Sequence, residues 1–292
     1  MIDALKAILK SEGTSGLIRT LSDRIFARKI AAFEVCRPFL DSLIGLEIGG
    51  PSSIFRRRRI FPVYSIAARI DNCNFSDKTI WEGAIAQGET FNYDERHAPG
   101  RQFIAEATDL SGIATESYNF ILSSHVLEHV ANPIRALTEW IRVLKVEGVI
   151  ALVVPHKQGT FDHRRPITTL QHLISDFEQG TPESDMTHAP EILNLHDLAR
   201  DPGAGDIEAF RVRTAGNVHN RGLHHHVFDT SLAARLMDFM HLQLLAVEAV
   251  KPHHIFVAAQ KLHGDLRPKN ELFLGQHAPY LSASPFQSDR AQ

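Results

Sequence analysis

Residues 112–155 read GIATESYNFILSSHVLEHVANPIRALTEWIRVLKVEGVIALVVP, and this stretch decides the fold. The apolar run at 119–123 predicts a buried strand, and the apolar spacing that follows predicts an amphipathic helix. A turn marked by Gly148 and a second apolar run at 149–154 complete a strand–helix–strand unit. Strands joined in this way are parallel and covered on both faces, so the pattern predicts an α/β fold.

The rest of the chain extends this unit into a larger sheet. Five further strands are predicted from apolar runs: 42–48, 67–70, 102–107, 243–251 and 254–260. Four helices are predicted: one near 78–87, and others at 169–178, 190–199 and 231–240, the last capped by Asp229 or Thr230. The expected architecture is a doubly wound, Rossmann-like sheet of seven strands, mostly parallel, with one antiparallel strand in the closing pair.

The sequence predicts five consecutive segments. These are a helical N-terminal segment (1–40), the ligand-binding half of the sheet domain (41–155), an inserted polar lid (156–230), a C-terminal helix with the closing strands (231–261), and a tail (262–292) expected to be loop or disordered. The chain has 17 histidines, and they cluster downstream of the central strand–helix–strand unit. We therefore expect the lid to carry much of the chemistry.

Composition narrows the classes of protein and partner. A hydrophobic fraction of 43% and a charged fraction of 22% are ordinary for a globular domain. The net charge of −3 gives no basis for nucleic-acid binding. The basic run at 56–59 is interpreted as a solvated helix face, with a phosphate-bearing acceptor as the alternative partner. Two cysteines, no secretory signal and no apolar run long enough to span a bilayer predict a cytoplasmic protein.

The segment Leu46-Glu47-Ile48-Gly49-Gly50-Pro51 ends the first predicted core strand with small residues that let a ligand approach the backbone. Together with the "LEHV" string after the 119–123 strand, it resembles class I S-adenosylmethionine (SAM)-dependent methyltransferases. The resemblance implies a Rossmann-like sheet with SAM at the carboxyl ends of its strands. The glycine loop is degenerate, but SAM has no phosphate for a third glycine to cradle, so a nicotinamide cofactor is disfavoured.

The resemblance also implies which residues hold the cofactor. Asp71, expected at the end of the second strand, would accept the ribose hydroxyls. Asp109 would lie by the adenine, with Leu110 packed on the base, and the fourth strand would end beside the methionine moiety. The predicted cofactor-binding residues are Glu47, Gly49, Gly50, Asp71, Asp109, Leu110, Ser123 and Ser124.

The string His125-Val-Leu-Glu128-His129 also matches H-x-x-E-H, the signature of some zinc peptidases. Its place directly after a core strand favours the methyltransferase interpretation over a zinc hydrolase. A related pattern binds a divalent cation in some quinone-type O-methyltransferases, so His125, Glu128 and His129 are also candidate metal ligands. A bound divalent metal remains an alternative to a metal-free site.

The acceptor side is predicted from charged and imidazole side chains of the lid. Arg164 and Arg165 could bind a carboxylate or phosphate, and His172 could line the acceptor pocket. Backbone alternation would turn His224 and His226 to one face of a strand and His225 to the other. A neutral imidazole suits removal of a hydroxyl proton. The candidate bases are His125, His129, His163, His224 and His226.

The segments 74–83, 162–178 and 224–232 resemble bacterial methyltransferases associated with glycan or sugar biosynthesis. The resemblance implies O-methylation of a small-molecule or glycan-linked hydroxyl by in-line displacement. Metal-assisted O-methylation is the second hypothesis, and a catalytically silent protein that binds a ligand or regulates a partner is the third. The sequence leaves the acceptor and the oligomeric state open.

Overall fold

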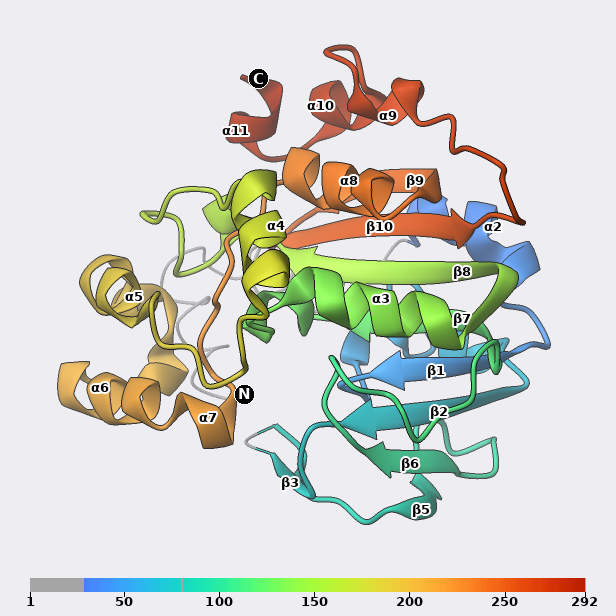
Figure 1. Cartoon of the computed structure of the whole chain (residues 1–292), viewed down its shortest axis with the longest axis horizontal. Coiled ribbons are helices and arrows are strands. Elements are labelled where there is room, and N and C mark those ends of the chain that lie inside the picture. The colour runs from blue at the N-terminus through green and yellow to red at the C-terminus, as the bar shows by residue number, and fades with distance from the viewer. Residues whose placement is uncertain (1–28, 80, 292) are drawn as a thin grey trace, which may run out of the picture.

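The computed structural model describes residues 29–79 and 81–291. Its centre is an eight-stranded sheet in the order β5-β6-β2-β1-β7-β8-β10-β9 within this described part of the chain (Figure 1). The strands are β1 (Ile44–Ile48), β2 (Arg69–Asn74), β5 (Gly88–Phe91), β6 (Gly100–Ile104), β7 (Tyr118–Ser124), β8 (Leu144–Pro155), β9 (Leu242–Val250) and β10 (His254–Lys261). The predicted Rossmann-like α/β fold is confirmed.

The strand directions follow the prediction with one addition. β6, β2, β1, β7 and β8 are parallel, whereas β10 is antiparallel to both β8 and β9. All seven predicted strands are present, and β5 adds an antiparallel edge strand next to β6. The sheet therefore has eight strands and two antiparallel members, where the sequence predicted seven and one.

Two apolar layers cover the sheet. Along β8, Ile150, Leu152 and Val154 face one cluster of buried side chains, and the alternate residues face a second cluster. The first cluster includes α3 (Pro133–Val143) and α8 (Thr230–Phe239), which lie in front of the sheet in Figure 1. The second contains α2 (Ala31–Cys36) and the aromatic residues of the loops that follow β1.

The helix after β7 begins later than the "LEHV" string suggests. Leu127–His129 forms a single 3₁₀ turn, η4, and α3 starts at Pro133. The Asn132 side chain caps α3 by accepting a hydrogen bond from the Arg135 backbone N–H at 3.1 Å. The intervening turn holds Glu128 and His129 at the carboxyl end of β7, outside any regular helix.

Three local predictions are wrong. The segment 78–87 contains the short strands β3 (Lys78–Thr79) and β4 (Gly83–Ala84), because Gly83 and Gly88 adopt positive φ angles that interrupt a helix. Gly148 lies within β8 where the backbone oxygen of Asn119 approaches closely, so it does not end a turn. The basic run at 56–59 lies in exposed turns after the 3₁₀ turn η2 (Ser53–Phe55) and is not a helix face.

The C-terminal tail differs from its prediction, and most of the N-terminal segment lies outside the described residues. The tail forms α9 (Glu271–Leu274), α10 (Pro279–Ala283) and α11 (Gln287–Arg290), so the expected loop or disorder is wrong there. Of the predicted N-terminal helices, α2 is present, and residues 1–28 lie outside the described residues. No helix among the described residues is long and apolar enough to cross a membrane.

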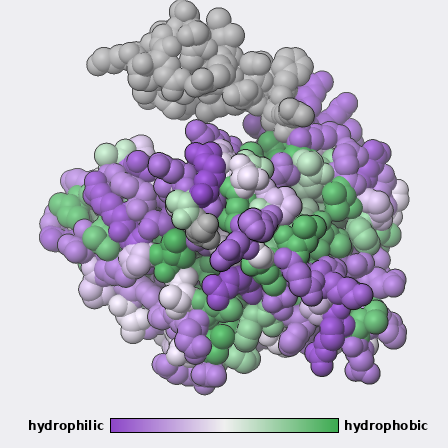
Figure 2. All heavy atoms as spheres, turned by 90° about the horizontal axis from the view of Figure 1, so that it is seen from above, coloured by the Kyte–Doolittle hydropathy of each residue, from purple (hydrophilic) through white to green (hydrophobic). Residues whose placement is uncertain are grey.

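The region between β8 and α8 packs over the carboxyl ends of the parallel strands (Figure 1). It contains α4 (Leu170–Gln179), α5 (Ala189–Leu195), α6 (Ile207–Ala215) and α7 (Asn217–Asn220), with 3₁₀ turns between them. A small apolar cluster of Ile192, Ala204, Phe210 and Leu223 holds part of it together. On the face seen in Figure 2, hydrophobic residues lie in groups between hydrophilic side chains.

Candidate functional site

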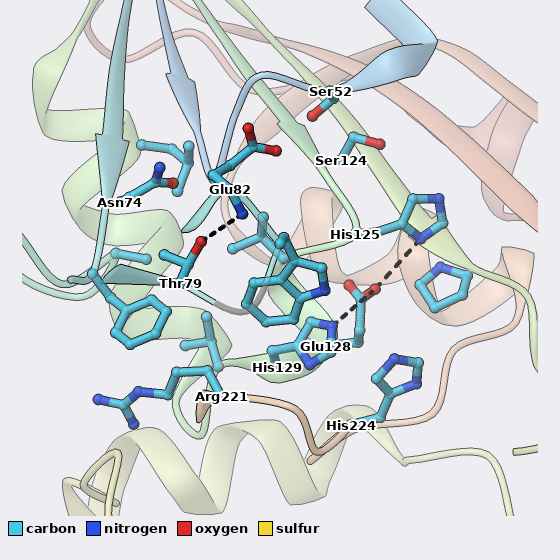
Figure 3. A pocket seen from close by; sticks show the side chains of 18 of the residues that line it. Ser52, Asn74, Thr79, Glu82, Ser124, His125, Glu128, His129, Arg221 and His224 are labelled. Atoms are coloured by element: carbon cyan, nitrogen blue, oxygen red, sulfur yellow. Dashed lines mark hydrogen bonds and ion pairs between the residues drawn. The ribbon is translucent and has the colours of Figure 1, made fainter. Parts of the chain in front are cut away.

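A cavity of about 480 Å³ lies where β1, β2, β6 and β7 end beneath the lid (Figure 3). Parallel sheets bind ligands at this edge, and the size is that of a cofactor or small-molecule pocket. Several polar side chains contribute to its lining: Ser52, Asn74, Thr79, Glu82, Glu106, Ser124, His125, Glu128, His129, Glu183, Arg200, Arg221, His224 and His253.

The turn after β1 forms one wall. Gly49 lines the cavity with φ +79°, and a Cβ at this position would lie 2.4 Å from Val126 Cγ2. Glu47 lies beneath this turn, fully buried, and accepts hydrogen bonds from the Ser52 N–H at 2.9 Å and the Tyr64 hydroxyl at 2.6 Å. Burial raises the pKa of Glu47 to about 7. Gly50 is absent from the lining, so Glu47 and Gly50 build the turn without facing the cavity.

Asp71 lies in the middle of β2, because that strand continues to Asn74. Its carboxylate accepts hydrogen bonds from Arg69 Nε at 2.7 Å, the Arg101 N–H at 2.8 Å and the Tyr118 hydroxyl at 2.9 Å. The structure therefore corrects the expected position of Asp71 at the strand end. Asn74 ends the strand and lines the cavity.

The third predicted strand, which is β6, also ends at a different residue from the one predicted. β6 ends at Ile104, so Asp109 lies five positions later on an exposed turn, where it accepts a hydrogen bond from the Ser111 N–H at 3.1 Å. Leu110 is fully buried in the apolar core. Neither lines the cavity. Glu106 does, and it pairs with Arg221 Nη2 at 2.6 Å.

The end of β7 separates the two predicted serines. Ser124 lines the cavity (Figure 3), whereas Ser123 is fully buried and its hydroxyl has no hydrogen-bond partner. Strand alternation explains the difference. His125 follows with φ +57°, and its N–H donates to the Val153 carbonyl at 2.9 Å, so its ring lies at the cavity wall.

The Glu128 carboxylate lies at the centre of an imidazole cluster. It is fully buried, 3.4 Å from His125 Nδ1 and 3.9 Å from His129 Nε2. Neither carboxylate oxygen has a hydrogen-bond partner. Burial alone would raise the pKa of Glu128, but the neighbouring histidines lower it overall. Burial and the nearby His224 lower the pKa of His129 to about 4.

His224 completes the cluster from the lid. Its Nδ1–H donates to Asp162 Oδ2 at 2.5 Å, and Asp162 also accepts a bond from Arg165 Nη1 at 3.0 Å. Burial opposes the charged imidazole, yet the Asp162 carboxylate raises the pKa of His224. The pKa of Asp162 is lowered to about 2, because the His224 and Arg165 interactions outweigh its burial. The remaining nitrogen, Nε2, is left for a ligand of the cavity.

Glu128, His129 and His224 could hold a metal ion, because one donor atom from each lies within 4.8 Å of the other two. The Nδ1 of His129 bonds to the Leu223 carbonyl at 2.9 Å, and that of His224 bonds to Asp162. In each ring Nε2 is therefore the nitrogen left as a possible ligand, and that of His129 lies 3.9 Å from Glu128 Oε1. Two imidazoles fixed by outer partners and one carboxylate form a donor set that fits a divalent cation. The predicted trio shared Glu128 and His129 but had His125 in place of His224.

Five other predicted residues do not line the cavity. His163 and Arg164 both pair with Asp197, at 2.8 and 3.3 Å. Arg165 is buried and structural, with bonds to the backbone oxygens of His224 and His225. His172 and His226 belong to a separate cluster, so His226 and His224 do not share a face. The turn at 224–226 is not a strand, and the expected alternation does not apply.

Several lining residues were not predicted from the sequence: Asn74, Trp81, Glu82, Glu106, Arg221 and His253. The first four lie just beyond strand ends or in the β3–β4 hairpin, whose course depends on tertiary packing. His253 sits in the turn between β9 and β10, next to a strand end that the sequence did predict. A search for polar residues in that turn could have found it.

The cavity suits a cationic ligand with aromatic and hydrogen-bonding groups. Trp81 and Phe75 supply aromatic surface, and Asn74, Glu82 and Glu106 supply polar groups near the ends of β2 and β6. The Glu128 carboxylate oxygens have no hydrogen-bond partner, so a cationic group of a ligand could interact with them. These features fit a sulfonium cofactor that carries adenosine.

Residues 68–152 match a family model described as a methyltransferase domain. The match covers 85 of the 292 residues, and over this part the chain is similar to methyltransferases. The match favours the predicted methyltransferase over a zinc hydrolase. No curated protein matches the chain.

Three solved structures of methyltransferases resemble the chain at low identity. A SAM-dependent methyltransferase from Aquifex aeolicus shares 11% identity with a TM-score of 0.42, covering 88% of this chain and 98% of its own. One from Mesorhizobium loti shares 13% identity with a TM-score of 0.46, covering 78% and 95%. A putative one from Listeria monocytogenes shares 14% identity with a TM-score of 0.43, covering 79% and 96%.

Proposed function

We propose that this methyltransferase acts on a hydroxyl group of a small-molecule or glycan-linked acceptor, with His224 as the base. The observation that carries the proposal is the buried His224–Asp162 pair, in which His224 lines the cavity and Asp162 holds its Nδ1. A carboxylate bonded to Nδ1 fixes the ring and its tautomer, and it makes Nε2 a stronger base. Hydroxyl acceptors need such a base because they must lose a proton during transfer.

The division of the cavity supports this assignment. Asn74, Glu82 and Glu106 lie on the side of β2 and β6, where the adenosine moiety would bind. Gly49 and Ser124 lie at the ends of β1 and β7, where the methionine moiety would bind. Bound SAM supplies a methyl group on its sulfonium. The lid, with His224 and Phe161, then faces the acceptor.

The chemical step requires alignment and one proton transfer. Bound SAM would supply the methyl group as its carbon–sulfur bond breaks, and His224 Nε2 would take the proton that the acceptor hydroxyl loses. Asp162 stabilises the imidazolium that results, and Arg165 holds Asp162 in place. Positioning by the closed cavity supplies much of the rate.

The test uses labelled SAM and a panel of sugars, nucleotide-sugars and small alcohols, with NMR to identify the methylated atom. We expect His224→Ala and Asp162→Asn to lower kcat by about 10²–10⁴-fold, the range for loss of a positioned base. SAM binding measured by calorimetry should be unchanged in both. His219→Ala is the matched control, because His219 is an exposed lid histidine outside the cavity. A His224→Ala variant with full kcat would refute the proposal.

Metal-assisted O-methylation is the second candidate, favoured by the convergence of Glu128, His129 and His224. In that case a cation would bind the acceptor oxygen, and His224 would be its ligand. Turnover after removal of metal, and its recovery with added Mg²⁺, Mn²⁺ or Zn²⁺, decides between the two. The metal-free base predicts unchanged turnover in the chelated enzyme, provided that the protein remains folded.

A further inference from the structure

A second group of imidazoles lies in the lid, apart from the SAM cavity. It contains His172 and Asp176 on α4, His188 just before α5, and His226 from the turn before α8. None of these side chains lines the cavity. One donor atom from each of the three histidines lies within 4.8 Å of the other two.

Two of the separations in this group are close to the distance between neighbouring ligands of a tetrahedral zinc ion. His172 Nε2 lies 3.2 Å from His188 Nε2 and 3.4 Å from Asp176 Oδ2. Zinc–nitrogen bonds of about 2.0–2.1 Å place two tetrahedral ligands about 3.3 Å apart. Residues four apart share one face of a helix, so His172 and Asp176 can act as a pair of ligands.

Hydrogen bonds within this group leave some of its nitrogen and oxygen atoms without a suitable partner. His172 Nε2 faces both His188 Nε2 and Asp176 Oδ2, and a single N–H cannot serve two partners fully. Asp176 Oδ2 is buried and has no hydrogen-bond partner, although Oδ1 is held by the Thr181 hydroxyl at 3.1 Å. A cation between the three atoms would satisfy all of them at once.

His226 is the fourth and most distant member. Its side chain is fully buried, and its Nε2 lies 3.9 Å from Asp176 Oδ2 and 3.3 Å from the Ala131 carbonyl. The contact with Ala131 is long for an N–H···O bond. A small ring movement would exchange it for a metal bond, and Nδ1, which has no partner, could keep the proton.

We propose that His172, Asp176, His188 and His226 form a structural zinc site that ties the lid together. Three nitrogen donors and one carboxylate in a tetrahedral arrangement are typical of zinc. The His172 side chain is 43% exposed, which gives the ion a path from solvent. The site would fasten α4, the start of α5 and the turn that carries His224 into the SAM cavity.

The test is the zinc content and zinc affinity of the whole chain. After chelation and dialysis, the wild-type protein should bind one equivalent of Zn²⁺ in calorimetry at this site, with a rise in melting temperature. His188→Ala and Asp176→Asn should each weaken this binding by at least about 100-fold, the upper end of the loss from an outer-shell change. His219→Ala should bind zinc as the wild type does.

A variant of the catalytic cluster separates the two metal hypotheses. Glu128→Gln should keep the equivalent that His188→Ala loses. Cobalt bound to the wild type should give the visible spectrum of a tetrahedral site, and His188→Ala should remove that signal. Circular dichroism shows whether the variants are folded. Absence of zinc binding by the wild type, or full stoichiometry in folded His188→Ala and Asp176→Asn, would overturn the proposal.

Discussion

At the scale of single residues, the turn after β1 depends on the backbone conformation of Gly49 and on the buried carboxyl group of Glu47. Gly49 has φ +79°, and it packs directly beside the Val126 side chain. Glu47 is buried beneath the same turn and accepts two hydrogen bonds. Both positions can be tested by substitutions whose effects have separate physical causes.

Gly49→Ala should lower the free energy of unfolding by more than the cost of its positive φ angle, which is about 1–2 kcal/mol. The added methyl group would meet Val126 Cγ2 at 2.4 Å. Gly83→Ala is the matched control, since Gly83 has φ +70° with nothing within 4 Å of an added Cβ. Urea unfolding measures both. Equal losses in the two variants would show that the contact with Val126 is not tight.

Glu47→Gln should change how stability depends on pH. The folded pKa of Glu47 is raised from 4.5 to about 7, so the folded state binds a proton more tightly than the unfolded state does. The resulting stability is fully present below pH 4.5 and is lost as the pH rises through 7. Between pH 5 and 8 the wild type should therefore lose about 1–3 kcal/mol that Glu47→Gln retains. Parallel pH profiles would contradict this expectation.

Two measurements distinguish a structural role of Asp71 from a cofactor-binding role of Asn74. Asp71→Ala should reduce stability by about 1–3 kcal/mol, because it removes the acceptor of the buried Tyr118 hydroxyl. Asn74→Ala should instead weaken SAM binding by a similar free energy, because Asn74 lines the cavity at the strand end. Calorimetry with SAM and chemical unfolding give the two values. A larger loss of SAM affinity in Asp71→Ala would restore the role predicted from the sequence.

At the scale of elements, the junction between β7 and α3 decides where Glu128 and His129 lie. The 3₁₀ turn Leu127–His129 delays the helix, and Asn132 then caps it and also donates to the Asp176 carbonyl at 2.9 Å. One side chain thus joins the sheet domain to α4 of the lid.

Asn132→Ala should cost about 1–2 kcal/mol of stability, because α3 loses its cap and the bond to α4. Asn132→Asp should lose less stability, since its carboxylate can still accept a hydrogen bond from the Arg135 N–H. A negative charge is also favourable at a helix N-terminus. Urea unfolding of the two variants and the wild type gives the order. An Asp variant less stable than the Ala variant would show that repulsion between the new carboxylate and the Asp176 carbonyl oxygen outweighs the retained cap.

At the scale of the whole molecule, the C-terminal tail closes the core. Asp289 on α11 is fully buried and accepts hydrogen bonds from Thr230 and Ser284, each at 2.6 Å. It also lies 3.1 Å from His156 Nε2. The tail therefore fastens both ends of the lid, at His156 and Thr230, to the sheet domain.

Asp289→Ala should destabilise the protein by about 2–4 kcal/mol, because it leaves a buried imidazole and a buried hydroxyl without their acceptor. Ser288→Ala is a control on the same helix, since its hydroxyl has no hydrogen-bond partner. Thermal unfolding measures both. A negligible effect of Asp289→Ala would mean that the tail contributes little to the folded state.

The sequence by itself determined the sheet. Apolar runs of strand length and the strand–helix–strand unit at 112–155 were predicted, because local periodicity reports which face of an element is buried. The antiparallel closing pair was implied by the methyltransferase resemblance. The same reasoning located the Gly49 turn, Ser124, His125, Glu128 and His129 at the cavity. These residues follow directly from strand ends, where position along the chain nearly fixes position in space.

Only the tertiary structure decided the details of the site. Strand length moved Asp71 and Asp109 away from the cavity and brought Asn74 and Glu106 to it. The partners of the lid histidines depend on contacts across long separations, such as Asp162 with His224. Sequence patterns show the periodicity of one element, but they do not show which side chains from distant elements meet. Packing of the lid on the sheet decides that.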